Sequence, residues 1–104
     1  MRREGAVQHR TTPRHAIAII GRVRTGTGAR DVTVLDLSVH GCRFHDRFGH
    51  LLEGTAVTIK LGPIGPIDAE VKWREKEHVG IAFASPLHPA VLDHIRAHFD
   101  LRRG

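Results

Sequence analysis

Two arginines, Arg10 and Arg14, stand four residues apart in a polar stretch near the start of the chain. A guanidinium group is planar and forked, so it suits bidentate recognition of phosphates and of guanine edges. Pro13 disfavours a helix through this stretch, so the pair differs from an ordinary surface pair on a helix. In an extended arm two such forks can close around a ligand from two sides, and we expect them to hold an anionic group.

A second polar cluster, Asp36, Ser38 and Gly41, lies at the end of a predicted strand. Alternation turns Leu35 and Leu37 toward the core, so Asp36 and Ser38 are expected to project together from the other face. An ionised carboxylate can accept two N–H groups at once, and a hydroxyl can donate or accept. Gly41 permits a positive φ or a close backbone approach. The alternative is a plain turn, which all three residue types favour.

Together the two clusters match the groups that a guanine nucleotide offers. Bidentate arginine reads guanine through O6 and N7. The N1–H and N2–H groups on the opposite edge are donors that a carboxylate accepts. A guanine nucleotide with phosphates would therefore use two arginines, one carboxylate and a neighbouring hydroxyl, and the sequence contains this set.

Other combinations of polar side chains carry less weight. Ser38, His40 and Cys42 could be assembled with the nearby carboxylate into a hydrolase, but a nucleophile needs a base within reach and an oxyanion site. Alternation also turns Cys42 toward the core. His94 and His98 are four residues apart on a predicted helix, but no third ligand is near by spacing. We therefore expect no enzyme, no metal site and no cofactor.

Period-two alternation and turn residues predict a mainly β fold. The expected strands are Ala16–Val23, Asp31–Leu37, Cys42–His45, Ala56–Leu61, Ile67–Arg74 and Val79–Phe83. Turns are expected at Gly26–Gly28, Gly62–Pro66 and Glu75–Glu77, the last of which would join a hairpin. In the second strand, Thr33 is expected to share the core face with the two leucines.

After the strands the period changes to that of a helix. Pro89 suits the first helical position, and the apolar residues that follow it recur at helical spacing. We expect a helix over about residues 88–101, packed on a small antiparallel β-barrel or roll. The expected organisation is an N-terminal arm over residues 1–14 and one domain over 15–104, a length that suits a single core.

The excess positive charge sits at one end of the chain. Residues 1–30 hold seven arginines and one acid, whereas residues 31–104 hold nine basic and ten acidic residues. This asymmetry predicts an anionic partner for the N-terminal segment, with a solvated basic tail as the alternative. The longest apolar run, Ala16–Ile20, is too short to span a membrane, and no apolar leader follows the first residues. A single cysteine fits a reducing setting, so we expect a cytoplasmic protein.

A nucleic-acid-binding barrel is the main competing interpretation. Such barrels stack bases on exposed aromatic side chains. This chain has no tyrosine and only five Phe and Trp residues, most of them on predicted core faces. Trp73 could stack on a base, but it follows Ile67, Ala69 and Val71 on one face of a strand, which favours a core position. Nucleic-acid binding is therefore not expected.

The sequence resembles a PilZ domain, the bacterial receptor module for cyclic di-GMP. The family carries an Arg-x-x-x-Arg motif before the first strand, matched by Arg10 and Arg14. It carries an Asp/Asn-x-Ser-x-x-Gly motif after the second strand, matched by Asp36, Ser38 and Gly41. The stretches 69–73 and 79–83 also resemble the family's later strand pair, and the likeness runs from about residue 9 onward.

The resemblance implies a six-stranded antiparallel β-barrel with a C-terminal helix and an arm that folds over bound cyclic di-GMP. Arg10 and Arg14 would contact guanine edges and phosphates. In the family, the residue before the first motif arginine influences how many ligands bind. Here it is His9, neither a second arginine nor an aliphatic residue, so the number of ligands stays open. Arg43 and Arg74 are possible secondary contacts. A downstream protein partner is expected, and the alternative within the family is an adaptor that binds no ligand.

Overall fold

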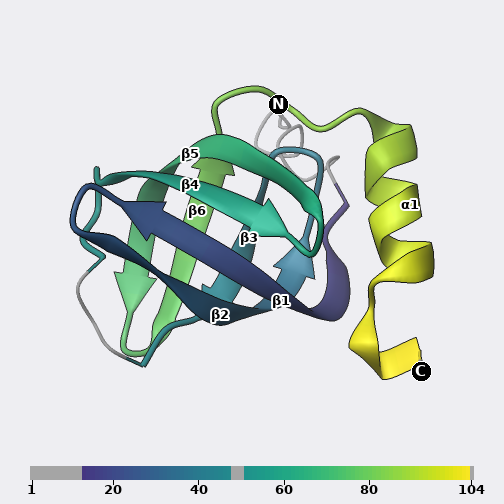
Figure 1. Cartoon of the computed structure of the whole chain (residues 1–104), viewed down its shortest axis with the longest axis horizontal. Coiled ribbons are helices and arrows are strands. Elements are labelled where there is room, and N and C mark those ends of the chain that lie inside the picture. Colours follow the sequence, from purple (N-terminus) through teal and green to yellow (C-terminus); the bar gives the residue numbers. More distant parts are fainter. Residues whose placement is uncertain (1–12, 48–50, 104) are drawn as a thin grey trace, which may run out of the picture.

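The computed structural model describes residues 13–47 and 51–103. Six strands, one α-helix and one short 3₁₀ helix follow each other along the chain (Figure 1). Their bounds are β1 His15–Thr25, β2 Gly28–Leu37, β3 Gly41–His45, β4 Ala56–Leu61, β5 Ile64–Glu75, β6 His78–Phe83, α1 Pro89–His98 and η2 Leu101–Arg103.

The six strands form a closed antiparallel barrel in the order β1-β2-β3-β6-β5-β4. Consecutive strands pair with each other except β3 and β4. Strand β3 pairs with β6 instead, and β4 pairs with β1 to close the barrel. The prediction of a six-stranded antiparallel barrel with a C-terminal helix is confirmed. Figure 1 shows α1 running across one end of the barrel, beside the bend where β1 begins.

The barrel interior is filled by the inward-facing side chain of every second residue. Among the largest fully buried side chains are Phe44, Ile19, Leu37, Ile59, Leu61, Val34, Val71 and Val79. Helix α1 adds Leu92 and Ile95 to this core, and Leu51 closes it from the loop that precedes β4. Pro89 begins the helix as expected, and the His88 side chain accepts a hydrogen bond from the Ala90 N–H at 3.0 Å.

Several sequence-based bounds are wrong. Strand β5 begins at Ile64, so only the first part of the predicted turn over residues 62–66 is a turn. The α-helix ends at His98 and is followed by the separate 3₁₀ turn η2, because Phe99 has left helical geometry. Within the described residues, no helix is long and apolar enough to cross a membrane.

The core face of β2 also differs from the prediction. Val32, Val34 and Leu37 are buried, whereas Thr33 and Leu35 are only partly buried. The register with β3 shifts between Val34 and Asp36, which marks a β-bulge. Since a bulge adds one residue to one strand, it breaks the period-two pattern on which the prediction depended.

Candidate functional site

Four residues form a row across the outer face of the barrel, one from each of four adjacent strands. The strand registers pair Asp36 with Arg43, Arg43 with Gly80, and Gly80 with Trp73. The residues on either side of Arg43 and of Gly80 are buried in the core, so these two positions face outward. We call Asp36, Arg43, Gly80 and Trp73 the outer row.

The Asp36 carboxylate holds one arginine with each of its oxygens. Arg14 Nη1 donates to Oδ1 at 2.8 Å, and Arg43 Nε donates to Oδ2 at 2.8 Å. The Asp36 side chain is 15% exposed, against 54% for Arg14 and 34% for Arg43. Because a guanidinium carries five N–H donors, both arginines keep donors that a ligand could use.

The pair between Arg14 and Asp36 joins the sequence motifs at one place. Arg14 directly precedes β1, and Ala16 of β1 pairs in register with Asp36 of β2. The first described residues of the predicted arm therefore meet the predicted acidic strand end. His9 and Arg10 lie outside the described residues.

Trp73 lies on the outer face, so the prediction that it belongs to the core is wrong. The register of β5 with β6 shifts between Val71 and Trp73, and this bulge turns the indole away from the core. A Cβ built on Gly80 would collide with the Trp73 ring. The half-buried indole therefore lies over Gly80 and next to Arg43 in the outer row.

The same bulge turns Arg74 toward a buried carboxylate. Arg74 pairs in register with the buried Val79, and its Nη2 donates to the Asp46 carbonyl oxygen at 3.1 Å. The Asp46 side chain is 1% exposed and also binds Arg30 through two hydrogen bonds of 2.9 and 2.8 Å. Those hydrogen bonds raise the pKa of Arg30. In the described structure Arg74 thus takes part in a structural ion-pair cluster that the sequence analysis did not anticipate.

Ser38 closes the turn between β2 and β3, and it does not project beside Asp36 as expected. Its side chain is buried, its Oγ accepts from the His40 N–H at 3.1 Å, and its N–H donates to the Gly41 carbonyl at 2.9 Å. Gly41 serves close approach, because a Cβ there would collide with the Ile81 carbonyl oxygen. For these two residues the turn interpretation describes the observed geometry.

Cys42 is fully enclosed by the core. Burial raises the pKa of its thiol, and the Asp36 carboxylate acts in the same direction. A thiolate is the reactive form of cysteine, so this thiol is not a nucleophile at neutral pH.

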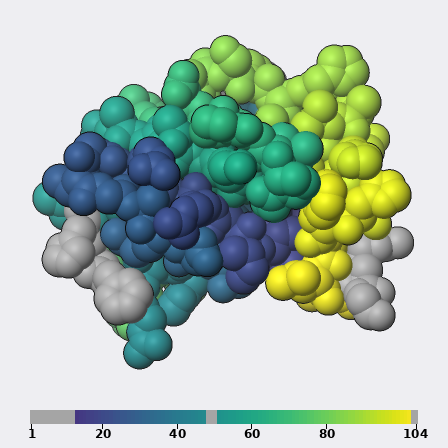
Figure 2. All heavy atoms as spheres, in the orientation of Figure 1, coloured from purple at the N-terminus to yellow at the C-terminus, as the bar shows by residue number. Residues whose placement is uncertain are grey.

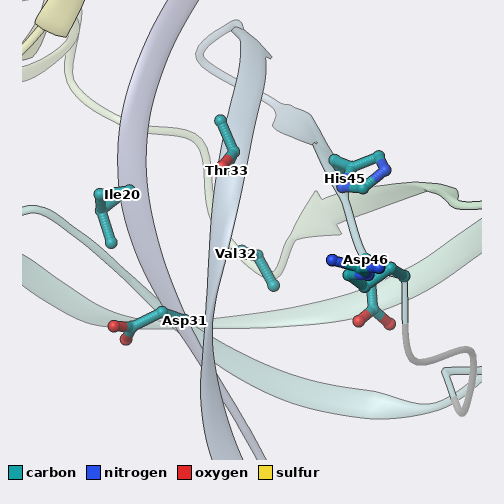
Figure 3. A pocket seen from close by; sticks show the side chains of 7 residues that line it. Ile20, Asp31, Val32, Thr33, His45 and Asp46 are labelled. Atoms are coloured by element: carbon teal, nitrogen blue, oxygen red, sulfur yellow. The ribbon is translucent and has the colours of Figure 1, made fainter.

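A separate hollow of about 180 Å³ lies over β1, β2 and β3, lined by residues that include Ile20, Thr33 and His45 (Figure 3). Ligand pockets for drug-sized molecules occupy about 300–1,000 Å³, so this hollow is too small for a dinucleotide. In Figure 3 the Asp46 carboxylate points away from Thr33 and Ile20. The outer row is the candidate site because Arg14 and Arg43 meet there at the Asp36 carboxylate.

Comparison with family models gives a match to the PilZ domain over residues 8–100. No curated protein matches the sequence. The matched range contains all six strands and helix α1. PilZ domains are a family of binding and receptor domains whose characteristic ligand is cyclic di-GMP. Since the match covers most of the chain, this protein belongs to the PilZ domain family.

Proposed function

We propose that this protein is a cyclic di-GMP receptor that binds its ligand on the outer row, beneath the N-terminal arm. One observation carries the proposal. The Asp36 carboxylate accepts hydrogen bonds of 2.8 Å from Arg14, which lies at the end of the arm, and from Arg43, which lies in the outer row. It therefore holds the two arginines side by side. The two motifs thus meet at one carboxylate, on the face where the half-buried Trp73 also lies.

Each group of the site matches a part of the ligand. The remaining N–H donors of Arg14 and Arg43 suit the two phosphodiesters and the O6 and N7 atoms of guanine. The Asp36 carboxylate can accept from the N1–H and N2–H groups of a guanine. Trp73 offers an aromatic face on which a base can stack. Arg10 would close over the ligand when the arm orders, and His9 beside it would affect how many ligands bind.

Ser38 and Gly41 act on the site through the shape of the turn. The Ser38 hydroxyl is occupied by turn hydrogen bonds, and Gly41 allows β3 to approach the β6 backbone. Both therefore fix the end of β2 that carries Asp36. Arg74 is assigned a structural role with Asp46 and no ligand contact.

Charge and entropy explain why several contacts must form together. Ordering the arm costs about 1–2 kcal/mol for each residue fixed. Charge-assisted hydrogen bonds contribute about 1.5–3 kcal/mol each, so one or two alone would not offset that cost. The ligand carries two negative charges, and two arginines with the acceptor Asp36 leave the site with net positive charge.

Calorimetric titration with cyclic di-GMP tests the proposal, with GMP and a short oligonucleotide as competing ligands. We expect saturable binding of cyclic di-GMP that weakens by about 10- to 150-fold in Arg14→Ala and Arg10→Ala, the equivalent of one charge-assisted bond. Arg22→Ala is the matched control. Arg22 is also half exposed and also binds one aspartate, Asp31, at 2.8 Å, but it lies outside the outer row.

The control separates recognition from net charge. Equal losses in Arg14→Ala and Arg22→Ala would refute the site. Comparable uptake of the oligonucleotide, with a steep dependence on salt, would favour a nucleic-acid-binding barrel. Uptake of neither ligand would favour an adaptor that binds only proteins.

We further propose that a protein partner reads the bound state. Closing the arm over the ligand would cover the outer row and create a new surface formed jointly by arm and barrel. A partner that contacts this surface would bind only the liganded protein, as linkage between the two binding events requires.

A further inference from the structure

Among the described residues, 13–47 and 51–103, the first residues of β1 have a strand neighbour on one side only. β2 pairs with β1 along its length, from His15 to Thr25. β4 pairs only with the stretch from Gly21 to Arg24. On that side, no strand in the described part of the chain pairs with the backbone groups of Ala16 and Ala18.

Asp100 and Arg102 take the place of the missing strand, and we call these two side chains the C-terminal clasp. The Ala18 N–H donates to Asp100 Oδ1 at 3.1 Å, and Arg102 Nη2 donates to the Ala16 carbonyl at 2.6 Å. The pair thus supplies one acceptor and one donor, as the backbone of a neighbouring strand would. Figure 2 shows the yellow C-terminal segment directly against the purple start of the barrel.

The two residues of the clasp also bind each other. Arg102 Nη2 lies 2.9 Å from Asp100 Oδ2, and the Arg102 backbone N–H donates to Asp100 Oδ1 at 3.0 Å. These contacts with Arg102 lower the pKa of Asp100, so the carboxylate is charged at neutral pH. The chain just before Asp100 is anchored to the barrel, because Ile95 of α1 is fully buried and the Phe99 ring packs against Gly62.

The clasp acts on the residue that faces the candidate site. Ala16 is held by Arg102 on one side and pairs in register with Asp36 on the other. Arg14 stands two residues earlier and binds the same Asp36. Two residues span at most about 7 Å, so a shift at Ala16 is transmitted to Arg14.

We propose that Asp100 and Arg102 are positioning residues for the ligand-binding arm: by completing the open edge of β1, they fix the point from which Arg14 reaches the outer row. This inference rests on the proposed function and extends it to the C-terminal turn. The coupling is reciprocal, so ligand that binds Arg14 also stabilises the clasp.

Titration of Arg102→Ala with cyclic di-GMP tests the positioning role, with Arg96→Ala as the matched control. Arg96 is the arginine in the last turn of α1 and contacts Asp93 at 3.9 Å. Both variants remove one positive charge from the same end of the protein. We expect Arg102→Ala to raise the Kd by about 5- to 30-fold, because one more residue must then be ordered when the ligand binds. Arg96→Ala is expected to leave the Kd within about twofold of the wild-type value.

A double-mutant cycle shows whether the clasp acts through Arg14. The effect of Arg102→Ala is expected to disappear when Arg14 is already alanine. An effect of the same size in both backgrounds would overturn the positioning role, as would equal Kd values for Arg102→Ala and Arg96→Ala. Asp100→Asn should behave as Arg102→Ala does, since it breaks the same ion pair.

Nitrogen relaxation of the Arg14 backbone amide, measured without ligand, keeps the two proposals apart. We expect greater mobility at Arg14 in Arg102→Ala and unchanged mobility in Arg96→Ala. If the wild-type protein binds no cyclic di-GMP, the proposed function fails, and this measurement alone decides the positioning role. Unchanged mobility of Arg14 in both variants would refute it.

Discussion

Replacing Gly80 with alanine tests whether Trp73 belongs to the binding surface. A Cβ at position 80 would collide with three atoms of the indole, Cε2, Nε1 and Cζ2. The backbones beneath cannot separate without breaking the pairing between β5 and β6. The indole must therefore leave its place over β6, while Arg43 on the neighbouring strand is unaffected.

The expected loss of affinity follows from the stacking energy. A base stacked on an aromatic side chain contributes about 1–3 kcal/mol, measured by substitution with alanine. Removing Trp73 from the outer row should therefore raise the Kd for cyclic di-GMP by about 5- to 150-fold. Forcing a methyl group into a packed position costs about 1–3 kcal/mol of stability, which leaves a folded barrel to assay. Trp73→Ala should lose a similar amount of affinity without the collision.

Intrinsic fluorescence reports the ring directly, because Trp73 is the only tryptophan and the chain has no tyrosine. The emission of Gly80→Ala should shift to the red as the ring enters water. Cyclic di-GMP should change the emission of the wild-type protein more than that of the variant. Gly26→Ala is the matched control, since nothing lies within 4 Å of a Cβ at that position.

Two results would refute the reasoning. If Gly80→Ala keeps the wild-type emission, the indole does not lie over Gly80. If the emission shifts but the Kd does not change, Trp73 is exposed but takes no part in binding.

Three further predictions concern charge and burial. Asp46→Ala should destabilise the protein by about 3 kcal/mol in urea unfolding, because it removes the buried carboxylate that pairs with Arg30 and Arg74. Asp31→Ala, which breaks an exposed pair, should cost at most about 1 kcal/mol. Cys42 should resist alkylation at about pH 8 until the protein unfolds, since burial raises its pKa; rapid labelling of the native protein would contradict this. The lowered pKa of Asp100 means that its stabilising contribution is complete above the unfolded carboxyl pKa of about 3.9 and is lost as the pH falls through the lower folded value. The Ala18 amide shift, followed by NMR from about pH 7 to about pH 1, should therefore stay constant through about pH 3.9 in the wild type and change only well below it, whereas it should stay flat throughout in Asp100→Asn.

The sequence predicted the number of strands and their places along the chain well, because each strand contains an alternating stretch and turn residues separate most of them. Ala56–Leu61 has the predicted bounds, and Cys42 and Phe44 are buried as expected. The strand pattern with one terminal helix predicted a barrel or a roll, and the six-stranded barrel followed from the resemblance to the PilZ family.

The bulges are what the sequence could not reveal. The bulges at Val34–Asp36 and Val71–Trp73 each add one residue without a glycine to mark it, and each reverses the faces of the residues that follow. In β5 this moved Trp73 outward and Arg74 onto Asp46, opposite to the prediction for both. The small Gly80 on the paired strand was the available signal, because a Cβ at that position would collide with the Trp73 ring.

The candidate site was only partly predictable, for a related reason. The arm and the strand end could be matched through their motifs, and Asp36 and Arg14 do meet. The sequence offered no way to see that Arg43 shares the same carboxylate, because that depends on the register of β3 against a bulged strand. The clasp was also hidden, since its partners lie more than eighty residues apart.

The open edge of β1 has a consequence for the behaviour of the protein in concentrated solution. Unpaired N–H and C=O groups at the edge of a sheet attract strands from other molecules and begin aggregation. Here a charged side-chain pair occupies those groups at Ala16 and Ala18, and the rest of the barrel is closed. The C-terminal turn therefore shields the molecule against intermolecular strand addition at the point where its own sheet is incomplete.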